Sequence, residues 1–159
     1  MDRIFSFEFT HDHSLIKQIM THPRVWPHIT DDASPPPAEF EPVDHPTVAY
    51  LLVRDGELPL GLFLFEQRGA VHIEFHTCLL PAAWARGSVA IGRQMMAWLW
   101  ENCPRLERLT GAVPQNNSLA LRFAQGLGMI EYGVNPQSFQ KNGVLLDQAL
   151  LGVNRPRRT

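Results

Sequence analysis

The chain has 159 residues, a length typical of one domain and long enough to bury a substantial core. A hydrophobic content of 45%, a charged content of 19% and a formal net charge of -2 describe an ordinary folded protein. The small net charge excludes a broad cationic surface, so we expect the chain to bind neither nucleic acid nor anionic lipid through bulk electrostatics.

The N-terminal part is predicted to contain one strand, one helix and a long irregular segment. Apolar and polar residues alternate over residues 4–9, which is typical of a strand. A helix is then expected after Asp12 or Ser14, either of which can cap it, and Pro23 should end it. Prolines are dense over residues 24–46, so this proline-rich loop should lack long regular structure. It could be a linker or a wall of a substrate pocket, for which Trp26 is the best lining candidate.

The middle of the chain predicts three consecutive antiparallel strands. Residues 47–53 and 58–66 flank an Asp55-Gly56 turn signal, and residues 70–80 form a third strand that Pro81 closes. In the second half, helices and strands alternate. Helices are expected over residues 88–102 and 117–127, and strands over residues 107–113, 129–132 and 144–153. This order predicts a mixed sheet and not a fully parallel one.

The two cysteines and the termini indicate the cellular setting. Cys78 and Cys103 lie in apolar surroundings and are expected to be buried free thiols, which makes a reducing cytoplasm the default. The N-terminus lacks the apolar stretch of a signal peptide, and no segment is long enough to span a membrane. We therefore expect one cytoplasmic domain over residues 1–159, ending in a solvated basic tail at 154–159 with Arg155, Arg157 and Arg158.

The segment after the third of these strands is the first candidate for chemistry. Residues 81–90 form a loop of small residues that opens a long helix, a geometry that presents unpaired backbone N–H groups to an anion such as phosphate. Gly87 could also be an ordinary turn residue. The loop matches neither the dinucleotide fingerprint nor the nucleotide P-loop, so a kinase or NTPase is not expected.

A second segment, after the strand at residues 107–113, matches a known family pattern. Residues 113–129 read Val-Pro-Gln-Asn-Asn-Ser-Leu-Ala-Leu-Arg-Phe-Ala-Gln-Gly-Leu-Gly-Met. Together with the element order and the small-residue loop, they resemble the GNAT N-acetyltransferases, in which an Asn opens a helix that ends in Leu-Gly and a large apolar residue. Asn117, Leu127, Gly128 and Met129 match this pattern. Residues 132–136 and 141–147 further resemble phage- or prophage-associated members, and the resemblance covers residues 47–153.

The resemblance implies an α/β (α+β) fold with a mixed, mostly antiparallel sheet of about seven strands flanked by helices. It also implies acetyl-CoA or coenzyme A as co-substrate and transfer of the acetyl group to a primary amine by direct attack in a ternary complex. The acceptor could be a small molecule or a peptide, and its identity is not readable. Since homodimers are frequent in the family, a homodimer is one expected state.

The resemblance also assigns coenzyme-binding residues. Backbone groups of Cys78, Leu79 and Leu80 would pair with the pantetheine amides. The pyrophosphate would lie on Arg86, Gly87, Ser88, Val89 and Ala90. Asn117 would reach the pantetheine arm or simply cap its helix. Arg122 would approach the adenosine phosphate or be an ordinary exposed helix residue.

Alternation along residues 70–80 gives the candidates for proton transfer. His72, Glu74, His76 and Cys78 share one face of the strand, and we favour Glu74 and His76 as the general base, directly or through water, because they lie closer to the loop. They could also be ordinary polar positions on a half-exposed face. The other histidines lack metal-ligand spacing, so no metal site is expected.

Two departures from the family pattern leave a rival hypothesis. The pyrophosphate loop is not a full match, since Val or Ala stands in place of a glycine. Ala124 occupies a position where many members carry a tyrosine that protonates the departing thiolate, a role left to water or to Tyr132. A non-catalytic GNAT-like module that binds coenzyme A or a protein is therefore the alternative, followed by an α/β interaction protein with no coenzyme.

Overall fold

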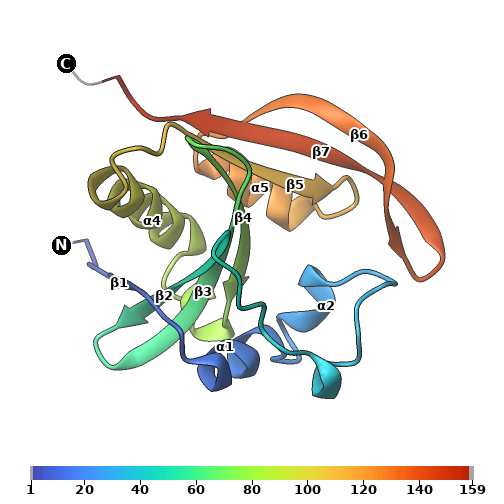
Figure 1. Cartoon of the computed structure of the whole chain (residues 1–159), viewed down its shortest axis with the longest axis horizontal. Coiled ribbons are helices and arrows are strands. Elements are labelled where there is room, and N and C mark those ends of the chain that lie inside the picture. The colour runs from blue at the N-terminus through green and yellow to red at the C-terminus, as the bar shows by residue number, and fades with distance from the viewer. Residues whose placement is uncertain (1, 158–159) are drawn as a thin grey trace.

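The computed structural model describes residues 2–157, which form a seven-stranded sheet with helices on both faces (Figure 1). The elements are, in chain order, β1 (Ser6–Phe9), α1 (His13–Met20), α2 (Trp26–Ile29), η1 (Pro37–Glu39), β2 (Val48–Asp55), β3 (Leu58–Gln67), β4 (His72–Leu79), α3 (Pro81–Trp84), α4 (Ser88–Asn102), β5 (Arg108–Pro114), α5 (Ser118–Gly126), β6 (Ile130–Lys141) and β7 (Val144–Asn154). The expected helices and strands are present, most of them with ends within two residues of the prediction.

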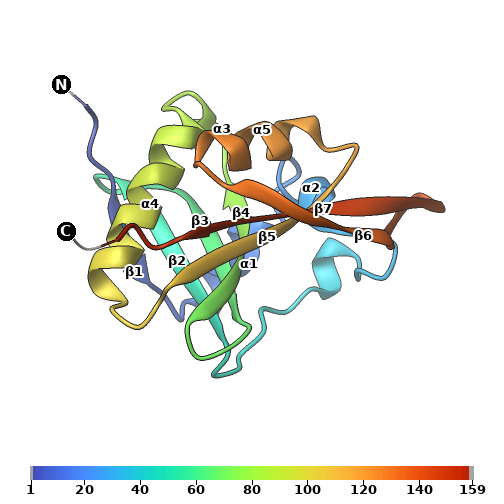
Figure 2. The same ribbon diagram turned by 90° about the horizontal axis from the view of Figure 1, so that it is seen from above.

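The strand order in the sheet is β1-β2-β3-β4-β5-β7-β6. Of its six neighbouring pairs, only β4 with β5 is parallel, which confirms the mixed, mostly antiparallel sheet. Helices α4 and α5 cover one face, and α1 and α2 cover the other (Figure 1). Figure 2 shows α3, α4 and α5 side by side along the sheet. No helix within residues 2–157 combines the length and the apolar character needed to cross a bilayer.

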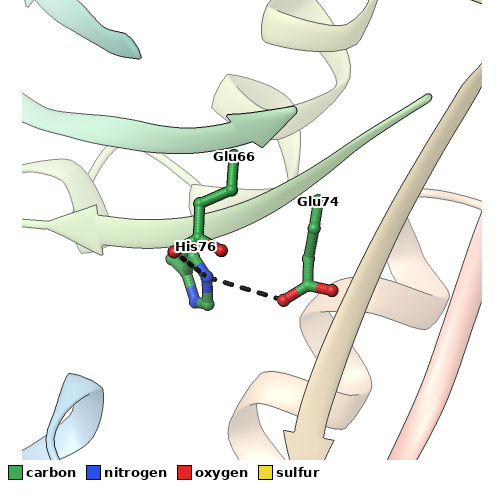
Figure 3. A group of neighbouring side chains, drawn as sticks. All are labelled: Glu66, Glu74 and His76. Carbon is green, nitrogen blue, oxygen red and sulfur yellow. Dashed lines mark ion pairs between the residues drawn. The ribbon is translucent and has the colours of Figure 1, made fainter. Parts of the chain in front are cut away.

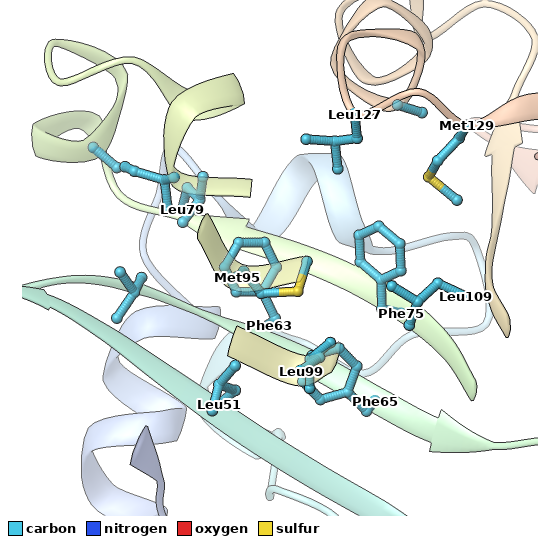
Figure 4. Close-up of a cluster of buried hydrophobic side chains, with 14 of the residues drawn as sticks. Leu51, Phe63, Phe65, Phe75, Leu79, Met95, Leu99, Leu109, Leu127 and Met129 are labelled. Carbon is cyan, nitrogen blue, oxygen red and sulfur yellow. The ribbon is translucent and has the colours of Figure 1, made fainter. Parts of the chain in front are cut away.

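The larger core cluster lies between the sheet and α4 and α5 (Figure 4). Phe63 and Phe75 meet in an edge-on contact with ring centroids 6.4 Å apart, and Met95 and Leu99 of α4 cover them. The smaller cluster packs α1 against the opposite face around Ile16 and Leu62. Because strand residues alternate between the two faces, β2, β3 and β4 each contribute to both clusters and are held in place by both.

The C-terminal hairpin is the main difference from the predicted elements. β6 extends to Lys141 and does not end near residue 132. The glycine, asparagine and proline at 133–136 mark a bulge inside the strand, where Gln137 has a φ of 49°. The Asp147 carboxylate accepts a hydrogen bond from the Gln137 amide at 2.8 Å and stabilises this bulge. Turn-forming residues therefore bend the strand without ending it.

The predicted solvated tail is wrong at Arg155. Its guanidinium donates hydrogen bonds to three backbone carbonyls, those of Trp100, Cys103 and Leu106, at 2.6 to 2.7 Å, and it stacks on the Trp100 ring. The carbonyls belong to the end of α4 and the following loop, whose unpaired oxygens attract a cation. Arg157 is exposed as expected, and Arg158 lies outside the described residues.

Candidate functional site

A gap opens in the sheet between β4 and β5. Parallel pairing is limited to His72–Glu74 with Arg108–Thr110, whereas β4 stays paired with β3 on its other side as far as Leu79. The second half of β4, from Phe75 onwards, therefore has no strand partner toward β5 within the described residues. An unpaired strand edge carries N–H and C=O groups that an extended, amide-containing ligand can bind.

The hydrogen-bonding register decides which backbone groups face the gap. The Leu80 amide donates to the Leu60 carbonyl at 2.9 Å, so Leu80 is directed toward β3. Alternation gives Cys78 the same direction and turns Thr77 and Leu79 toward β5. Of the three residues predicted to pair with pantetheine, Leu79 alone turns its backbone groups toward the gap. Its carbonyl already accepts a hydrogen bond from the Trp84 Nε1 at 3.2 Å, which leaves the Leu79 amide. The sequence pattern gave the side-chain faces of this strand but not the direction of its hydrogen bonds.

The start of α4 has the character expected of an anion site. Gly87 is the N-cap residue and has a φ of 92°, a backbone conformation that is strained for every residue except glycine. No side chain caps the helix, and the amides of Ser88, Val89 and Ala90 donate to no acceptor among residues 2–157. These free donors lie at the positive end of a 15-residue helix.

Arg86 lies beside this loop, but its guanidinium is already engaged elsewhere. Its Nε donates to the Asp55 carboxylate at 2.6 Å, and its Nη1 donates to the Ala82 carbonyl at 2.9 Å. The hydrogen bond from Arg86, with the nearby charge of Arg3, holds the pKa of the Asp55 carboxyl below its ordinary value. Arg86 therefore fastens the loop to the β2–β3 turn, which weakens its assignment as the cation for a pyrophosphate.

Asn117 and Arg122 are both on or beside α5, which follows β5 at the rim of the gap. The Asn117 Oδ1 accepts a hydrogen bond from the Ala120 amide at 3.1 Å. Asn117 therefore caps the helix, which was one of the two roles predicted for it. Its side-chain NH₂ remains available to a ligand. Arg122 is exposed and forms no ion pair with any residue in the range 2–157.

Glu74 and His76 project from β4 into a polar cluster that also contains Glu66 (Figure 3). Glu66 lies directly opposite Glu74 in the β3–β4 register. The His76 Nε2 is 3.8 Å from the nearest carboxylate oxygen of each glutamate. Sequence reasoning missed Glu66, although the register of the predicted hairpin would have placed it beside Glu74.

Arg68 holds the two carboxylates of this cluster together. Its Nη2 lies 2.6 Å from Glu66 Oε2 and 3.1 Å from Glu74 Oε1. Partial burial alone would lower the pKa of the Arg68 guanidinium, but the hydrogen bond with Glu74 and the charges of Glu74 and Glu66 raise it. Arg68 thus remains a cation that offsets the repulsion between the glutamates.

The side chains of His76, Glu66 and Glu74 are 38%, 35% and 23% exposed, so solvent and a ligand can reach them. Their potential ligand atoms lie within 4.8 Å of one another, a grouping that could hold a divalent cation only after Arg68 had moved. With Arg68 in place, Glu66 Oε1 and Glu74 Oε2 accept no hydrogen bond from residues 2–157, so each carboxylate keeps one oxygen that can bind an ammonium group or accept a proton.

The position of the missing tyrosine and the alternative at Tyr132 lie in different parts of the fold. Ala124 is buried against the core and has no polar side chain. Tyr132 lies under the Arg108 guanidinium, 5.0 Å from its ring centroid, beside the start of β5 and of β4. It is therefore at the end of β4 opposite to Leu79.

Comparison with known proteins identifies the fold. No protein-family model matches the chain, and no curated protein matches its sequence. Among solved structures, the chain is similar to the spermidine N-acetyltransferase of Vibrio cholerae in complex with CoA and spermine (TM-score 0.68, 15% identity, 94% of this chain and 95% of that one). It is also similar to an aminoglycoside N(6')-acetyltransferase of Legionella pneumophila (TM-score 0.72, 12% identity, 97% and 94%).

A third similar structure is a putative acetyltransferase of Salmonella typhimurium with its cofactor acetyl-CoA (TM-score 0.69, 16% identity, 98% of this chain and 96% of that one). The match extends over nearly the whole length of all three proteins. At these identities the likeness concerns the fold alone. The chain therefore has the fold seen in GNAT acetyltransferases, as the sequence predicted.

Proposed function

We propose that the chain is an acetyl-CoA-dependent N-acetyltransferase that moves the acetyl group to a primary amine by direct attack in a ternary complex. The observation that carries the proposal is the gap between β4 and β5, which ends beside the uncapped start of α4. The gap offers unpaired backbone groups to amides, and the helix start offers free N–H groups to phosphates. Coenzyme A contains both kinds of group in the matching order. Similar structures with CoA or acetyl-CoA bound support this assignment.

The pantetheine arm would run along the free edge of β4, with the Leu79 amide and the Thr77 backbone as its partners and the Asn117 amide group on the opposite rim. The pyrophosphate would lie on the amides of Ser88, Val89 and Ala90, with Gly87 providing the close approach. Arg122 remains a candidate for the adenosine phosphate. In this orientation the thioester points away from α4, along β4 toward Glu74.

The acceptor amine would bind at the cluster of Glu66, Glu74 and His76. An ammonium group must lose a proton before its nitrogen can attack, and His76 or Glu74 would accept that proton directly or through water. The nitrogen lone pair then forms a bond to the thioester carbonyl carbon. As the C–S bond breaks, the nitrogen gives its second proton to water and the thiolate takes a proton from water, so the products are the amide and the free thiol. This is feasible because a thiol with a pKa near 8.5 is a good leaving group at neutral pH.

Two measurements on one sample test this proposal. Acetyl-CoA in excess over its dissociation constant should raise the melting temperature, since a ligand at about 100 times its Kd stabilises the folded state by about 2.7 kcal/mol. A panel of primary amines should then give thiol release with at least one acceptor. Stabilisation without turnover on any amine would favour the non-catalytic coenzyme-binding module, and the absence of stabilisation would contradict coenzyme binding altogether.

Five of the sequence-based expectations stay predictions: the acceptor, the homodimer, the one-domain organisation, the cytoplasmic location and the resemblance to phage-associated members. Two of the similar proteins are named after their acceptors: one is a spermidine acetyltransferase and the other an aminoglycoside acetyltransferase. Both names describe cationic amines, which is consistent with two carboxylates in the acceptor cluster.

A further inference from the structure

We propose that Arg24, stacked on the indole ring of Trp84, supplies the cation that binds the phosphates of the coenzyme, in place of Arg86. The inference rests on the proposed function and names a residue that the sequence pattern did not indicate. It follows from three observations: where Trp84 is held, what Arg24 lacks, and what Arg86 already binds.

Trp84 connects the two parts of the proposed coenzyme site. Its indole Nε1 donates to the Leu79 carbonyl at the end of β4, at a distance of 3.2 Å. Its backbone carbonyl accepts a hydrogen bond from the Gly87 amide, also at 3.2 Å. Trp84 is nevertheless 42% exposed. Trp84 is thus an ordered and accessible platform between the free edge of β4 and the start of α4.

Arg24 reaches this platform from a distant part of the sequence, the turn between α1 and α2. The Cζ atom of its guanidinium is 5.1 Å from the centroid of the Trp84 ring, a cation–π contact. Arg24 is exposed and forms no ion pair with a carboxylate anywhere in residues 2–157. Stacking orders the guanidinium while leaving its five N–H donors free, which suits planar recognition of a phosphate.

Arg86 would be the obvious alternative because it precedes Gly87 directly. Its bonds to Asp55 and to the Ala82 carbonyl use Nε and Nη1, and Asp55 neutralises its charge. Moving it to a phosphate would break an ion pair of 2.6 Å and leave Asp55 with Arg3 alone at 3.4 Å. Arg24 has no such partner to lose. Binding a phosphate therefore costs Arg24 less reorganisation than it costs Arg86.

Calorimetric titration of the full chain with two ligands tests the proposal: coenzyme A, which carries the phosphates, and pantetheine, which does not. Arg24→Ala should weaken coenzyme A binding by about tenfold or more, because a charge-assisted contact is lost. It should leave pantetheine binding unchanged, and it should weaken coenzyme A binding more than Arg86→Ala does. Arg105→Ala, which removes an exposed arginine from the loop before β5, is the matched control and should bind both ligands as the original protein does.

Each outcome is decisive. An Arg24→Ala variant with unchanged affinity for coenzyme A overturns the inference while the proposed function stands. An equal loss of affinity for both ligands also overturns it, because Arg24 would then act by holding Trp84 in place and not through the phosphates. If the unmodified protein binds no coenzyme A at all, the proposed function fails and the inference fails with it. Circular dichroism of each variant verifies that it is folded.

Discussion

Glu66 and Glu74 lie directly opposite each other across the antiparallel pair β3–β4. Like charges at directly opposed positions destabilise a sheet, so such a pair needs compensation. Here Arg68 bonds both carboxylates and His76 lies 3.8 Å from each of them. The protein thus keeps a destabilising pair of carboxylates at an accessible position beside the strand gap. Proteins commonly accept such a cost in stability at functional sites.

The first prediction concerns proton transfer by this cluster. We expect His76→Ala or Glu74→Gln to lower turnover by about 10²-fold to 10⁴-fold, the usual contribution of a general base, with little change in coenzyme affinity. Steady-state kinetics with the acceptor found in the amine panel would measure the first quantity, and titration with coenzyme A the second. Unchanged turnover in both variants would rule out the assignment of the base.

Glu66→Gln separates binding from catalysis in the same cluster. Because Glu66 is on the neighbouring strand and is bonded to Arg68, we expect its loss to raise KM for the acceptor more than it lowers kcat. The opposite result, a large fall in kcat at unchanged KM, would make Glu66 itself the better candidate for the base.

The second prediction concerns the conformation of Gly87. With a φ of 92° at the start of α4, a Gly87→Val variant must strain or rearrange the loop, and the amides of the first turn would lose their alignment. Coenzyme affinity should fall. Gly69→Val is the matched control, because Gly69 has ordinary backbone geometry and open space around it. Equal coenzyme affinity in the two variants would show that the pyrophosphate lies elsewhere.

The elements that could be predicted from the sequence are those with strong periodicity. The buried residues of α4 recur at helical spacing over 15 residues, and β2, β3 and β4 are apolar or alternating runs bounded by turn signals, so the limits of these elements could be predicted. The short helices α2 and α3 have only four residues each, with proline in the first turn, and give no periodic signal. The bulge of β6 was mistaken for the end of a strand because its residues are those of turns.

The candidate site could be predicted only in part, because some of its contacts depend on more than one element. Alternation on β4 correctly placed Glu74, His76 and Cys78 on one face, since that depends on the strand alone. Glu66, Arg68 and the direction of the Leu80 amide depend on how β4 pairs with β3. The stacking of Arg24 on Trp84 depends on how the segment between α1 and α2 lies over the sheet. Strand register and contacts between distant segments are not set by the pattern within a single element.

The third prediction concerns the stability contributed by Arg155. Replacing it with alanine leaves three carbonyls at the end of α4 and in the following loop without their donor, and it removes the stacking on Trp100. We expect a loss of about 2 to 4 kcal/mol in the free energy of unfolding. Urea denaturation would measure it, with Arg157→Ala, an exposed neighbour, as the control. A loss as small as that of the control would contradict the anchoring role.

The fourth prediction concerns the contact between the tip of the β6–β7 hairpin and the segment after α2. The Asp32 carboxylate accepts hydrogen bonds from the Asn142 and Gly143 amides at 2.7 and 2.9 Å, and the Lys141 Nζ donates to the Thr30 carbonyl at 2.7 Å. Asp32→Ala should speed hydrogen exchange at the hairpin tip and lower stability by about 1 to 3 kcal/mol. Exposed Asp44 offers the control substitution. Unchanged exchange at the tip would show that the hydrogen bond from the Asp32 amide to the Gln140 carbonyl and the Lys141 contacts are enough to hold it.

The last prediction is the effect of pH on stability through His72. Burial lowers the pKa of this imidazole from its ordinary value of 6.5, the charge of Arg108 adds to the effect and that of Arg68 adds slightly, while Glu74 opposes it. Between the lowered pKa and pH 6.5 the unfolded chain binds more protons at this position than the folded chain does. The stability linked to a neutral His72 is therefore fully present above pH 6.5 and is lost as the pH falls below it. The His72 Nε2 lies 2.6 Å from the hydroxyl of buried Thr110. If Nε2 is the acceptor of this hydrogen bond, protonation of the imidazole breaks it; if Nε2 is the donor, the bond survives protonation.

His72→Asn keeps a polar group near Thr110 and removes the titration. The melting temperature of the original protein should fall more steeply than that of the variant as the pH is lowered from about 6.5 to about 5, and the two should run parallel above pH 7. The remaining acid sensitivity of the variant would come from carboxylates such as Asp55, whose lowered pKa has the same sign of effect at lower pH. Parallel curves over the whole range would mean that His72 gains its proton as readily in the folded chain as in the unfolded one.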